Sequence, residues 1–410
     1  MIKVCDAVMG TGKSSAAITY INEHPEKKFI YITPYLEEAK RIKDACPNAH
    51  FVEPSNADDE YDHKKLVHSA ALIHKGFNIT STHQAFKGYT HDMLTDVRRN
   101  GYTLIIDESV DVLEQFNVNP DDLQMVIDAG YIKEDNGAFS IIKDDYKGNA
   151  FRDLFNMLKS RELVRIKRRS DSLFYWVLPP ELVMAFDDVF ILTYLFEGQS
   201  IHHFLEIYNI QYEFIGIDHT DGVFRFCDGP GYTPEYVSNL RNMIHILDND
   251  KLNSIGDGTY SLSMNWFKTP ENVEKLKKNM YNCFRNVWGD CAADKRMWGA
   301  YSDAEYKLRG KGYSNAFIVF NQRAVNGYRD KNHLIYPINI FMNVEEKKFY
   351  AMHGVDVDED LYALSIMIQW IWRSEIRDGS EIYIYVPSKR MRTLLINWID
   401  SVSKGGSENA

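Results

Sequence analysis

The feature that most constrains this chain is a glycine-rich loop near residue 10. An apolar run over Ile2–Cys5 leads into Asp6-Ala7-Val8-Met9-Gly10-Thr11-Gly12-Lys13-Ser14, and a helix-like stretch follows from Ser15. Glycines let backbone N–H groups curl around an anion, and the helix adds the positive end of its dipole. Strand, glycine loop and helix in this order predict a phosphate-binding loop in an α/β fold with a parallel sheet.

The loop residues have predicted roles in binding ATP with Mg²⁺. Lys13 would reach the β- and γ-phosphates, and Ser14 would hold Mg²⁺ through its hydroxyl. The cofactor-binding set is completed by the neighbouring residues Gly10, Thr11, Gly12 and Ser15. Ala7 stands where the usual pattern has its first glycine, but the GTGKS core is intact.

An acidic pair is predicted to complete the nucleotide site. The apolar run Thr103–Ile106 ends in Asp107 and Glu108, and such a strand delivers carboxylates to the edge of a parallel sheet where ligands bind. Asp107 would contact Mg²⁺ through its water shell. Glu108 would position the attacking water or accept its proton.

Polar residues follow two further strand-like runs. Lys28–Ile32 leads into Thr33, and the run at 77–79 leads into a segment that contains Thr82 and His83. Such side chains can hydrogen-bond the phosphates of a nucleic-acid strand. The alternative is ordinary loop and helix-cap chemistry.

The ordered set GTGKS, ITP, TSTHQ and IIDES resembles the first domain of superfamily 2 helicases, of the compact kind found in phage genomes. The resemblance implies an α/β chain of two tandem RecA-like domains that hydrolyses ATP in the cleft between them. It also implies a nucleic-acid partner, with DNA favoured over RNA, and replication or recombination proteins as candidate partners. Thr193 fits the family's coupling motif after a strand, whereas Tyr194 departs from it.

Strand and helix signals restart near residue 207, so we expect domains over 1–204 and 205–410, with an insertion at about 115–185 in the first. In the second domain, Asn321 and Arg323 resemble a motif that approaches nucleic acid. The family's next motif has glutamine followed by arginines at +4 and +7. Here Gln369 is followed by Arg373 and Arg377, at +4 and +8. A continuous helix over 361–377 would place all three on one face, where either arginine could stabilise the transferring phosphoryl group.

The insertion carries a basic run within an acidic chain. The net charge of −11 argues against binding nucleic acid by bulk electrostatics. From Lys159 to Arg169 there are nevertheless six basic residues, of which Lys167, Arg168 and Arg169 are our candidate contacts. Aromatic residues at 174–176 suit stacking on a single strand or a hydrophobic domain edge equally well.

The cysteines and the absence of apolar tracts favour a cytoplasmic protein. The five cysteines are an odd number without a CxxC pair, and the histidines form no cluster at metal spacing. We therefore expect reduced thiols, no disulfide framework and no zinc site. No apolar run approaches the ~18–20 residues of a membrane span.

Two alternative functions remain open at this stage. In a DNA-packaging motor with a ribonuclease-H-like domain, Asp218 would bind metal together with Asp356, Asp358 or Asp360. A nucleotide-switched binding protein would use ATP to change partners, and its ATPase would be indifferent to nucleic acid.

Overall fold

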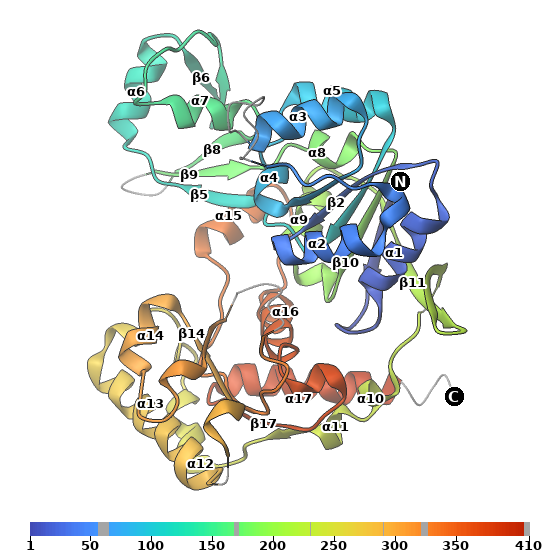
Figure 1. Cartoon of the computed structure of the whole chain (residues 1–410). Helices are drawn as coiled ribbons and strands as arrows, with labels where there is room; N and C mark the ends of the chain where they lie inside the picture. The colour runs from blue at the N-terminus through green and yellow to red at the C-terminus, as the bar shows by residue number, and fades with distance from the viewer. Residues whose placement is uncertain (56–64, 168–171, 230, 290, 321–326, 406–410) are drawn as a thin grey trace. The chain divides into compact units, whose positions relative to one another are not determined.

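The computed structural model describes all residues except 56–64, 168–171, 230, 290, 321–326 and 406–410 (Figure 1). The described chain forms two compact units. The first comprises residues 1–7, 12–232 and 344–356, and the second comprises 8–11, 233–343 and 357–410. The first unit therefore extends well beyond residue 204, where the sequence placed a domain boundary.

The first unit is built on a seven-stranded sheet of order β12-β11-β1-β10-β4-β2-β3, in which neighbouring strands are parallel except for the antiparallel pair β11–β12 (Figure 1). The strands are β1 (Ile2–Asp6), β2 (Lys28–Thr33), β3 (Ile79–Thr82), β4 (Tyr102–Asp107), β10 (Asp188–Thr193), β11 (Tyr212–Thr220) and β12 (Val223–Asp228). The last two form a hairpin. Strand β11, which follows the boundary expected at residue 204, pairs with β1 of the first unit.

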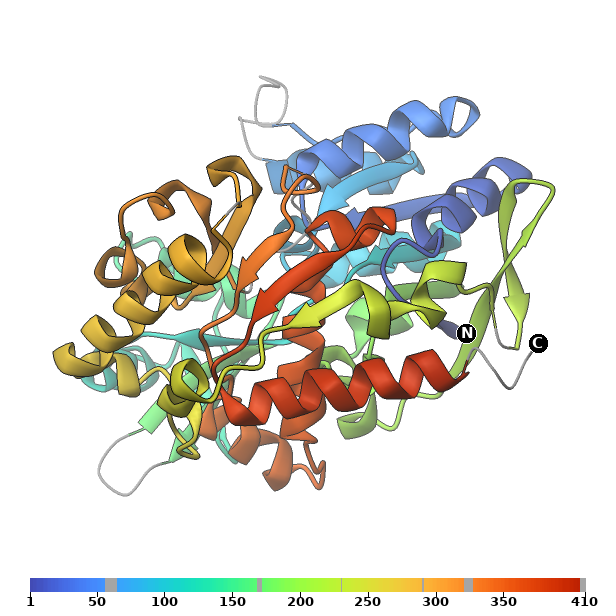
Figure 2. The same ribbon diagram turned by 90° about the horizontal axis from the view of Figure 1, so that it is seen from below.

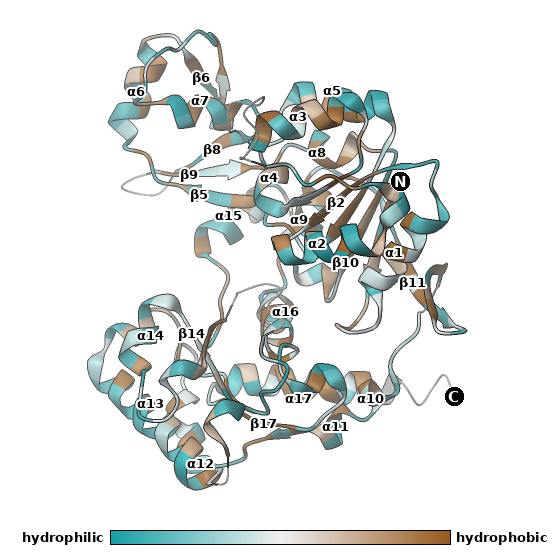
Figure 3. Cartoon of the chain, viewed as in Figure 1, coloured by the Kyte–Doolittle hydropathy of each residue, from teal (hydrophilic) through white to brown (hydrophobic). Residues whose placement is uncertain are grey.

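Helices cover this sheet, and its central strands are buried. All six residues of β4 are buried, and β2 and β10 are coloured as hydrophobic in Figure 3, as expected for parallel strands covered on both faces. The helices of this unit include α1 (Lys13–Glu23), α2 (Leu36–Ala45), α3 (Lys65–Lys75), α4 (His83–Phe86), α5 (His91–Asn100), α8 (Glu181–Met184) and α9 (Ser200–Ile207). The parallel order brings the ends of β1, β4 and β10 to one edge.

A second, antiparallel sheet lies in the region expected to be an insertion. Its order is β5-β9-β8-β7-β6. The elements are β5 (Leu113–Phe116), α6 (Pro120–Asp128), β6 (Ile132–Asp135), β7 (Ala138–Ile141), α7 (Arg152–Leu158), β8 (Glu162–Lys167) and β9 (Ser172–Val177). The sheet and its helices share a hydrophobic core that includes Leu123, Phe155 and Trp176.

The aromatic residues of β9 are part of the fold of this insertion. Phe174, Tyr175 and Trp176 are 2%, 0% and 1% exposed, and Phe174 and Trp176 belong to the insertion's core. Buried rings cannot stack on the bases of a nucleic acid. Of the two readings of this stretch, the structure therefore supports the hydrophobic one.

One helix from late in the sequence belongs to the first unit. Helix α15 (Val344–Met352) carries Glu346. Burial, with a smaller contribution from the nearby carboxylate of Asp111, raises the pKa of Glu346 to about 7. Asp111 lies in the segment that follows β4, so α15 approaches the region beyond the predicted acidic pair.

Replacing Glu346 with glutamine is expected to stabilise the protein above pH 7. The folded state holds the Glu346 proton up to about pH 7, whereas the unfolded chain releases it near its ordinary pKa of ~4.3. The free energy of unfolding therefore falls as the pH rises between these values. Glutamine does not ionise, so Glu346→Gln should be more stable than the parent above pH 7 by about 1–3 kcal/mol. Urea unfolding at pH 5 and pH 8, with the exposed Glu37→Gln as control, measures it. An equal effect of Glu346→Gln at both pH values would contradict this expectation.

The second unit has a five-stranded, wholly parallel sheet of order β13-β17-β16-β14-β15. The strands are β13 (Ile244–Ile246), β14 (Arg296–Ala300), β15 (Phe317–Val319), β16 (His333–Ile335) and β17 (Ile382–Tyr385). The helices include α10 (Glu235–Ser238), α11 (Leu240–Met243), α12 (Asp250–Asn253), α13 (Pro270–Asn282), α14 (Ser302–Leu308), α16 (Glu359–Ile371) and α17 (Lys389–Gly405). Figure 2 shows the long α17 beside α10 and α11. A parallel α/β layout in both units agrees with the predicted fold class.

Candidate functional site

The glycine-rich loop leaves β1 and enters α1, as the sequence predicts. Gly10 and Gly12 have φ of 86° and 92°, a left-handed conformation that residues with a side chain rarely adopt. The Thr11 hydroxyl donates to the carbonyl of Val8 at 2.8 Å, which tightens the turn. The first N–H groups of α1 have no partner within the helix, so this end can receive an anion.

The predicted phosphate-binding lysine lies across this loop. The Lys13 ammonium donates a hydrogen bond to the carbonyl of Ala7. Burial lowers the pKa of Lys13, and the nearby Asp107 opposes this shift. A partly desolvated ammonium beside backbone N–H groups is suited to binding phosphate oxygens.

The structure brings together the two predicted magnesium-binding residues. The Ser14 hydroxyl donates to a carboxylate oxygen of Asp107 at 2.8 Å, although the two residues lie on different elements. Tyr31 donates to the same oxygen at 2.8 Å, and the His83 ring donates to the Asp107 carbonyl at 3.0 Å. Burial raises the pKa of Asp107, and the hydrogen bonds from Tyr31 and Ser14 oppose it. One hydroxyl and one carboxylate offer the hard oxygen ligands that Mg²⁺ prefers.

Tyr31 is a site residue that sequence reasoning missed. It lies within β2, next to β4 in the sheet, and it is fully buried. Sequence reasoning treated it as one apolar position of a strand. Only the pairing of β2 with β4 shows that its hydroxyl reaches Asp107.

Glu108 follows β4 in an unusual backbone conformation. Its φ is 64°, in the left-handed region that costs a residue with a side chain about 1–3 kcal/mol. Its N–H donates to the carbonyl of Leu192 on β10 at 3.0 Å. The neighbouring strand thus fixes the backbone of the predicted water-positioning residue.

The predicted coupling residue Thr193 connects the loop to α9. Its backbone carbonyl accepts a hydrogen bond from Ala7 N–H at 3.1 Å, and its hydroxyl donates to the Gln199 side chain at 2.7 Å. Gln199 in turn donates to the carbonyl of Tyr194 at 2.7 Å. Gln199 is a second residue that the sequence did not single out.

The β11–β12 hairpin packs the ring of Phe224 against the phosphate-binding loop. A Cβ atom placed on Gly12 would lie 2.3 Å from the ring of Phe224. His219 stacks on this ring with centroids 4.0 Å apart and planes at 7°. Position 12 therefore requires glycine for two reasons. Its φ is left-handed, and the Phe224 ring leaves no room for a Cβ atom.

Gly12→Ala is expected to displace the loop and lower the free energy of unfolding by about 1–3 kcal/mol. The Phe224 ring would have to move, and the alanine would adopt a strained φ. Thermal unfolding with and without Mg-ATP measures both stability and nucleotide binding. Gly222→Ala is the matched control, since Gly222 has φ of 75° but no atom of the described residues within 4 Å of an added Cβ. If Gly12→Ala is no worse than this control in stability and in ATP binding, the packing argument is wrong.

The polar residues at the ends of β2 and β3 have roles within the fold. Thr33 is fully buried, and the Thr82 hydroxyl accepts from Ala85 N–H at 3.4 Å as the cap of α4. His83 is 8% exposed and bonds to Asp107. Thr33 is thus not presented to a ligand, and the cap chemistry considered for Thr82 is what the structure shows.

Acidic residues pair with three of the four basic residues that the structure describes in the basic run of the insertion. Three of its members form ion pairs with neighbouring carboxylates: Lys159 with Asp144 at 2.8 Å, Arg161 with Glu114 at 2.7 Å and Arg165 with Glu134 at 3.1 Å. Lys167 is exposed, whereas Arg168 and Arg169 lie outside the described residues. The same is true of Asn321 and Arg323.

The predicted arginines of the second unit do not share one helix. Helix α16 ends at Ile371, and Arg377 lies in a separate turn over Glu375–Asp378. The expectation of a continuous helix to residue 377 is therefore wrong. Arg373 is 7% exposed, and a guanidinium nitrogen donates to the Val319 carbonyl at 3.5 Å. Gln369 is half-buried on α16.

The aspartates proposed for a nuclease have other partners. Asp218 lies on the β11 hairpin and accepts from the Thr220 hydroxyl. Asp358 caps α16 and Asp360 pairs with Arg390 at 2.7 Å, while Asp356 is exposed. Within the described part of the chain, no acidic cluster of metal-binding geometry includes them.

Comparison with known proteins identifies a relative along nearly the whole chain. The SPbeta prophage-derived protein YonV of Bacillus subtilis (strain 168) is 35% identical over 416 residues, covering 98% of this chain and 99% of that protein. This chain belongs to the YonV family. The family model of the YonV C-terminal Rossmann-like domain matches residues 238–399, which include the sheet of the second unit.

Comparison with solved structures shows which fold this chain shares. The structure of S. tokodaii Xpd4 covers 97% of this chain, and this chain covers 94% of it, with a TM-score of 0.51 and 11% identity. A DEAD box protein from Methanococcus jannaschii covers 98% of the chain, which covers 86% of it, at 13% identity and a TM-score of only 0.28. The first likeness establishes a shared α/β fold with two RecA-like domains. No helix in the described parts of the chain is long and apolar enough to cross a membrane.

Proposed function

We propose that this chain is an ATP-driven nucleic-acid translocase of the helicase type. The observation that carries the proposal is the convergence of Lys13, Ser14 and Asp107 at one edge of the first sheet. Glu108 follows Asp107 directly, in a backbone conformation fixed by β10. The likeness in fold to Xpd4 supports the same proposal.

The residues present fit ATP together with Mg²⁺. Ser14 and Asp107 would hold the ion, which when bound neutralises charge on the phosphates. Lys13 and the N–H groups of α1 would bind the phosphate oxygens. Glu108 would position the attacking water and accept its proton.

The second unit would contribute an arginine to the reaction. Arg373 or Arg377 would stabilise charge on the transferring phosphoryl group, which requires the two units to close on one nucleotide. The Thr193–Gln199 hydrogen bond would relay that closure to α9. Alternating closure and release would then move the protein along a strand.

Nucleic acid, with DNA favoured over RNA, is the proposed partner. The candidate contacts are Thr82, His83, Lys167, Arg168, Arg169, Asn321 and Arg323, and replication or recombination proteins are proposed as further partners. The cleavage alternative has no support from a described metal cluster.

Nucleic-acid affinity in different nucleotide states tests the proposal. Fluorescence anisotropy would compare single-stranded DNA, duplex DNA and RNA with no nucleotide, with ADP, and with ATP on a Glu108→Gln variant. We expect at least one nucleic acid to be bound with an affinity that changes between ADP and ATP. No binding in any state would contradict a translocase.

Replacing Lys167, Arg168 and Arg169 with alanine is expected to weaken binding of single-stranded DNA and to flatten its salt dependence. Each lost phosphate contact lowers the log–log slope by about 0.7. The double variant Lys159→Ala/Arg165→Ala is the control, because those side chains already pair with Asp144 and Glu134. Unchanged affinity and slope in the triple variant would assign the run to ordinary surface.

A further inference from the structure

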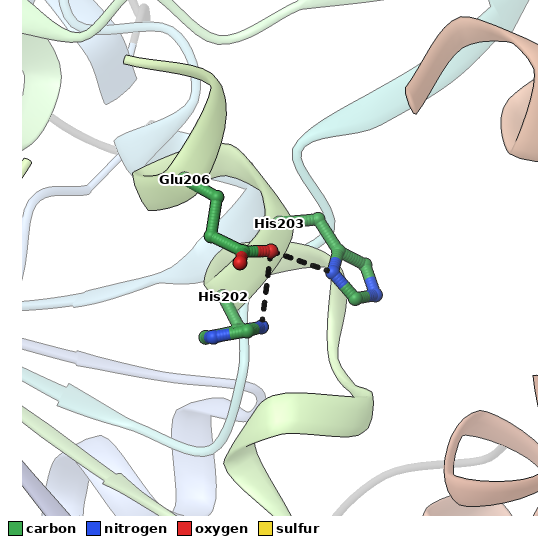
Figure 4. A group of neighbouring side chains, drawn as sticks. All are labelled: His202, His203 and Glu206. Carbon is green, nitrogen blue, oxygen red and sulfur yellow. Dashed lines mark ion pairs between the residues drawn. The ribbon is translucent and has the colours of Figure 1, made fainter. Parts of the chain in front are cut away.

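Helix α9 carries two adjacent histidines and a glutamate that converge on one point (Figure 4). Glu206 lies four residues after His202 and three after His203, and both spacings bring side chains together on a helix. One carboxylate oxygen of Glu206 lies 3.5 Å from the Nδ1 atom of each histidine. The three ligand atoms all lie within 4.8 Å of one another, and this is the sole such group among the described residues.

We propose that His202, His203 and Glu206 form a binding site for Zn²⁺ or a similar late divalent transition metal. Two imidazole nitrogens and one carboxylate oxygen are typical ligands of such ions, and Mg²⁺ prefers oxygen. Tetrahedral coordination with bonds of about 2.0–2.1 Å sets ligand atoms roughly 3.3–3.5 Å apart. The two distances to Glu206 already match this spacing, and the fourth position would be left to water.

Burial of the histidines provides a second, independent observation. The His203 side chain is 2% exposed and that of His202 is 13% exposed. Nδ1 of His202 and both ring nitrogens of His203 are buried and make no geometrically regular hydrogen bond with any described residue, although both Nδ1 atoms face Glu206 at 3.5 Å. Buried polar atoms are rarely left in this state, and two of these three nitrogens point toward the shared Glu206 oxygen (Figure 4). A metal would take up both of their lone pairs.

The proposed site lies where α9 packs against other elements of the first unit. The His203 ring packs edge-on against Tyr350 of α15, with centroids 5.0 Å apart. The Ser200 hydroxyl donates to the carbonyl of Val110 at 3.3 Å, in the segment that follows Glu108. A metal on α9 would hold the His203 ring in the orientation in which it contacts Tyr350. The proposal does not depend on ATP hydrolysis.

Metal titration of the full chain, prepared without a polyhistidine tag and stripped of metal, tests the site. Co²⁺ would be the spectroscopic probe and Zn²⁺ its competitor. We expect one Co²⁺ per chain with visible absorption bands, displaced by stoichiometric Zn²⁺ and unaffected by millimolar Mg²⁺. Glu206→Gln and His202→Gln should each weaken binding at least tenfold.

The control is His245→Ala, which removes a surface histidine paired with Glu381 at 2.9 Å. That pair has one imidazole and one carboxylate but no second histidine. His245→Ala should therefore leave the Co²⁺ affinity of the chain within twofold of the wild-type value. The Glu206 side chain is 44% exposed, so Glu206→Gln is expected to fold, which circular dichroism verifies. Equal Co²⁺ affinity in wild type and Glu206→Gln, or an equal loss in His245→Ala, would overturn the proposal.

Discussion

Replacing Lys13 with alanine is expected to reduce ATP hydrolysis by at least about 10²–10³-fold and to weaken nucleotide binding. The ammonium lies across the phosphate-binding loop, where it donates to the Ala7 carbonyl. Without it, the β- and γ-phosphates lose their principal cation, and loss of one transition-state donor alone costs about this factor. Steady-state ATPase assays and equilibrium binding of a fluorescent ATP analogue measure the two effects.

Glu108→Gln separates these effects and serves as the matched comparison. The amide keeps the size of the side chain and leaves Lys13, Ser14 and Asp107 in place, so ATP should still bind. Hydrolysis should fall because the amide cannot accept the proton of water. Wild-type turnover in Lys13→Ala would refute the phosphate-loop assignment. Wild-type turnover in Glu108→Gln would move the base elsewhere, with Asp111 the nearest substitute.

Removing the arginines of the second unit is expected to leave ATP affinity within a few fold and to reduce hydrolysis by up to about 10³–10⁵-fold. Arg373→Ala and Arg377→Ala would be measured singly and together. Lysine replacements should rescue poorly, because lysine keeps the charge but loses the planar two-pronged donor. Stimulation of hydrolysis by nucleic acid should fall in parallel, since both need closure of the two units.

Stability must be measured alongside these arginine variants. Arg373 is 7% exposed and bonds to the carbonyl of Val319, so its removal costs folding free energy, whereas Arg377 is half-buried and gives the cleaner variant. Arg241→Ala, which removes a largely exposed arginine paired with Asp400, is the control for a lost surface charge. A folded double variant that hydrolyses ATP like the parent would show that the second unit does not complete the site. The switch alternative would then gain support.

The nucleotide-site residues could be predicted because their signals are local. Gly10, Gly12 and Lys13 lie in one short loop whose composition dictates its backbone. Asp107 and Glu108 directly end a buried strand. Tyr31 and Gln199 were missed because their hydrogen bonds depend on pairing between strands and on a turn, which no short pattern encodes.

The errors in the second half also have physical causes. The β11–β12 hairpin is signalled by Asp221-Gly222, which both have positive φ as such a turn requires. The hairpin joins the sheet of the first unit through β1, although it follows the boundary expected at residue 204. The helix predicted to reach residue 377 ends at Ile371. Beyond it, the N–H and the hydroxyl of Ser374 both donate to the Ile371 carbonyl, at 3.0 and 2.6 Å, in a tighter turn than that of an α-helix.

The most direct test of the account is the steady-state ATPase rate of the full chain with and without nucleic acid. Single-stranded DNA, duplex DNA and RNA would each be added at saturating concentration. The rate of the Glu108→Gln variant would be subtracted as the background rate of hydrolysis. The account predicts Mg²⁺-dependent hydrolysis that at least one nucleic acid, DNA in preference to RNA, accelerates severalfold or more. Hydrolysis that is absent, or that proceeds at one rate whatever nucleic acid is present, would contradict it.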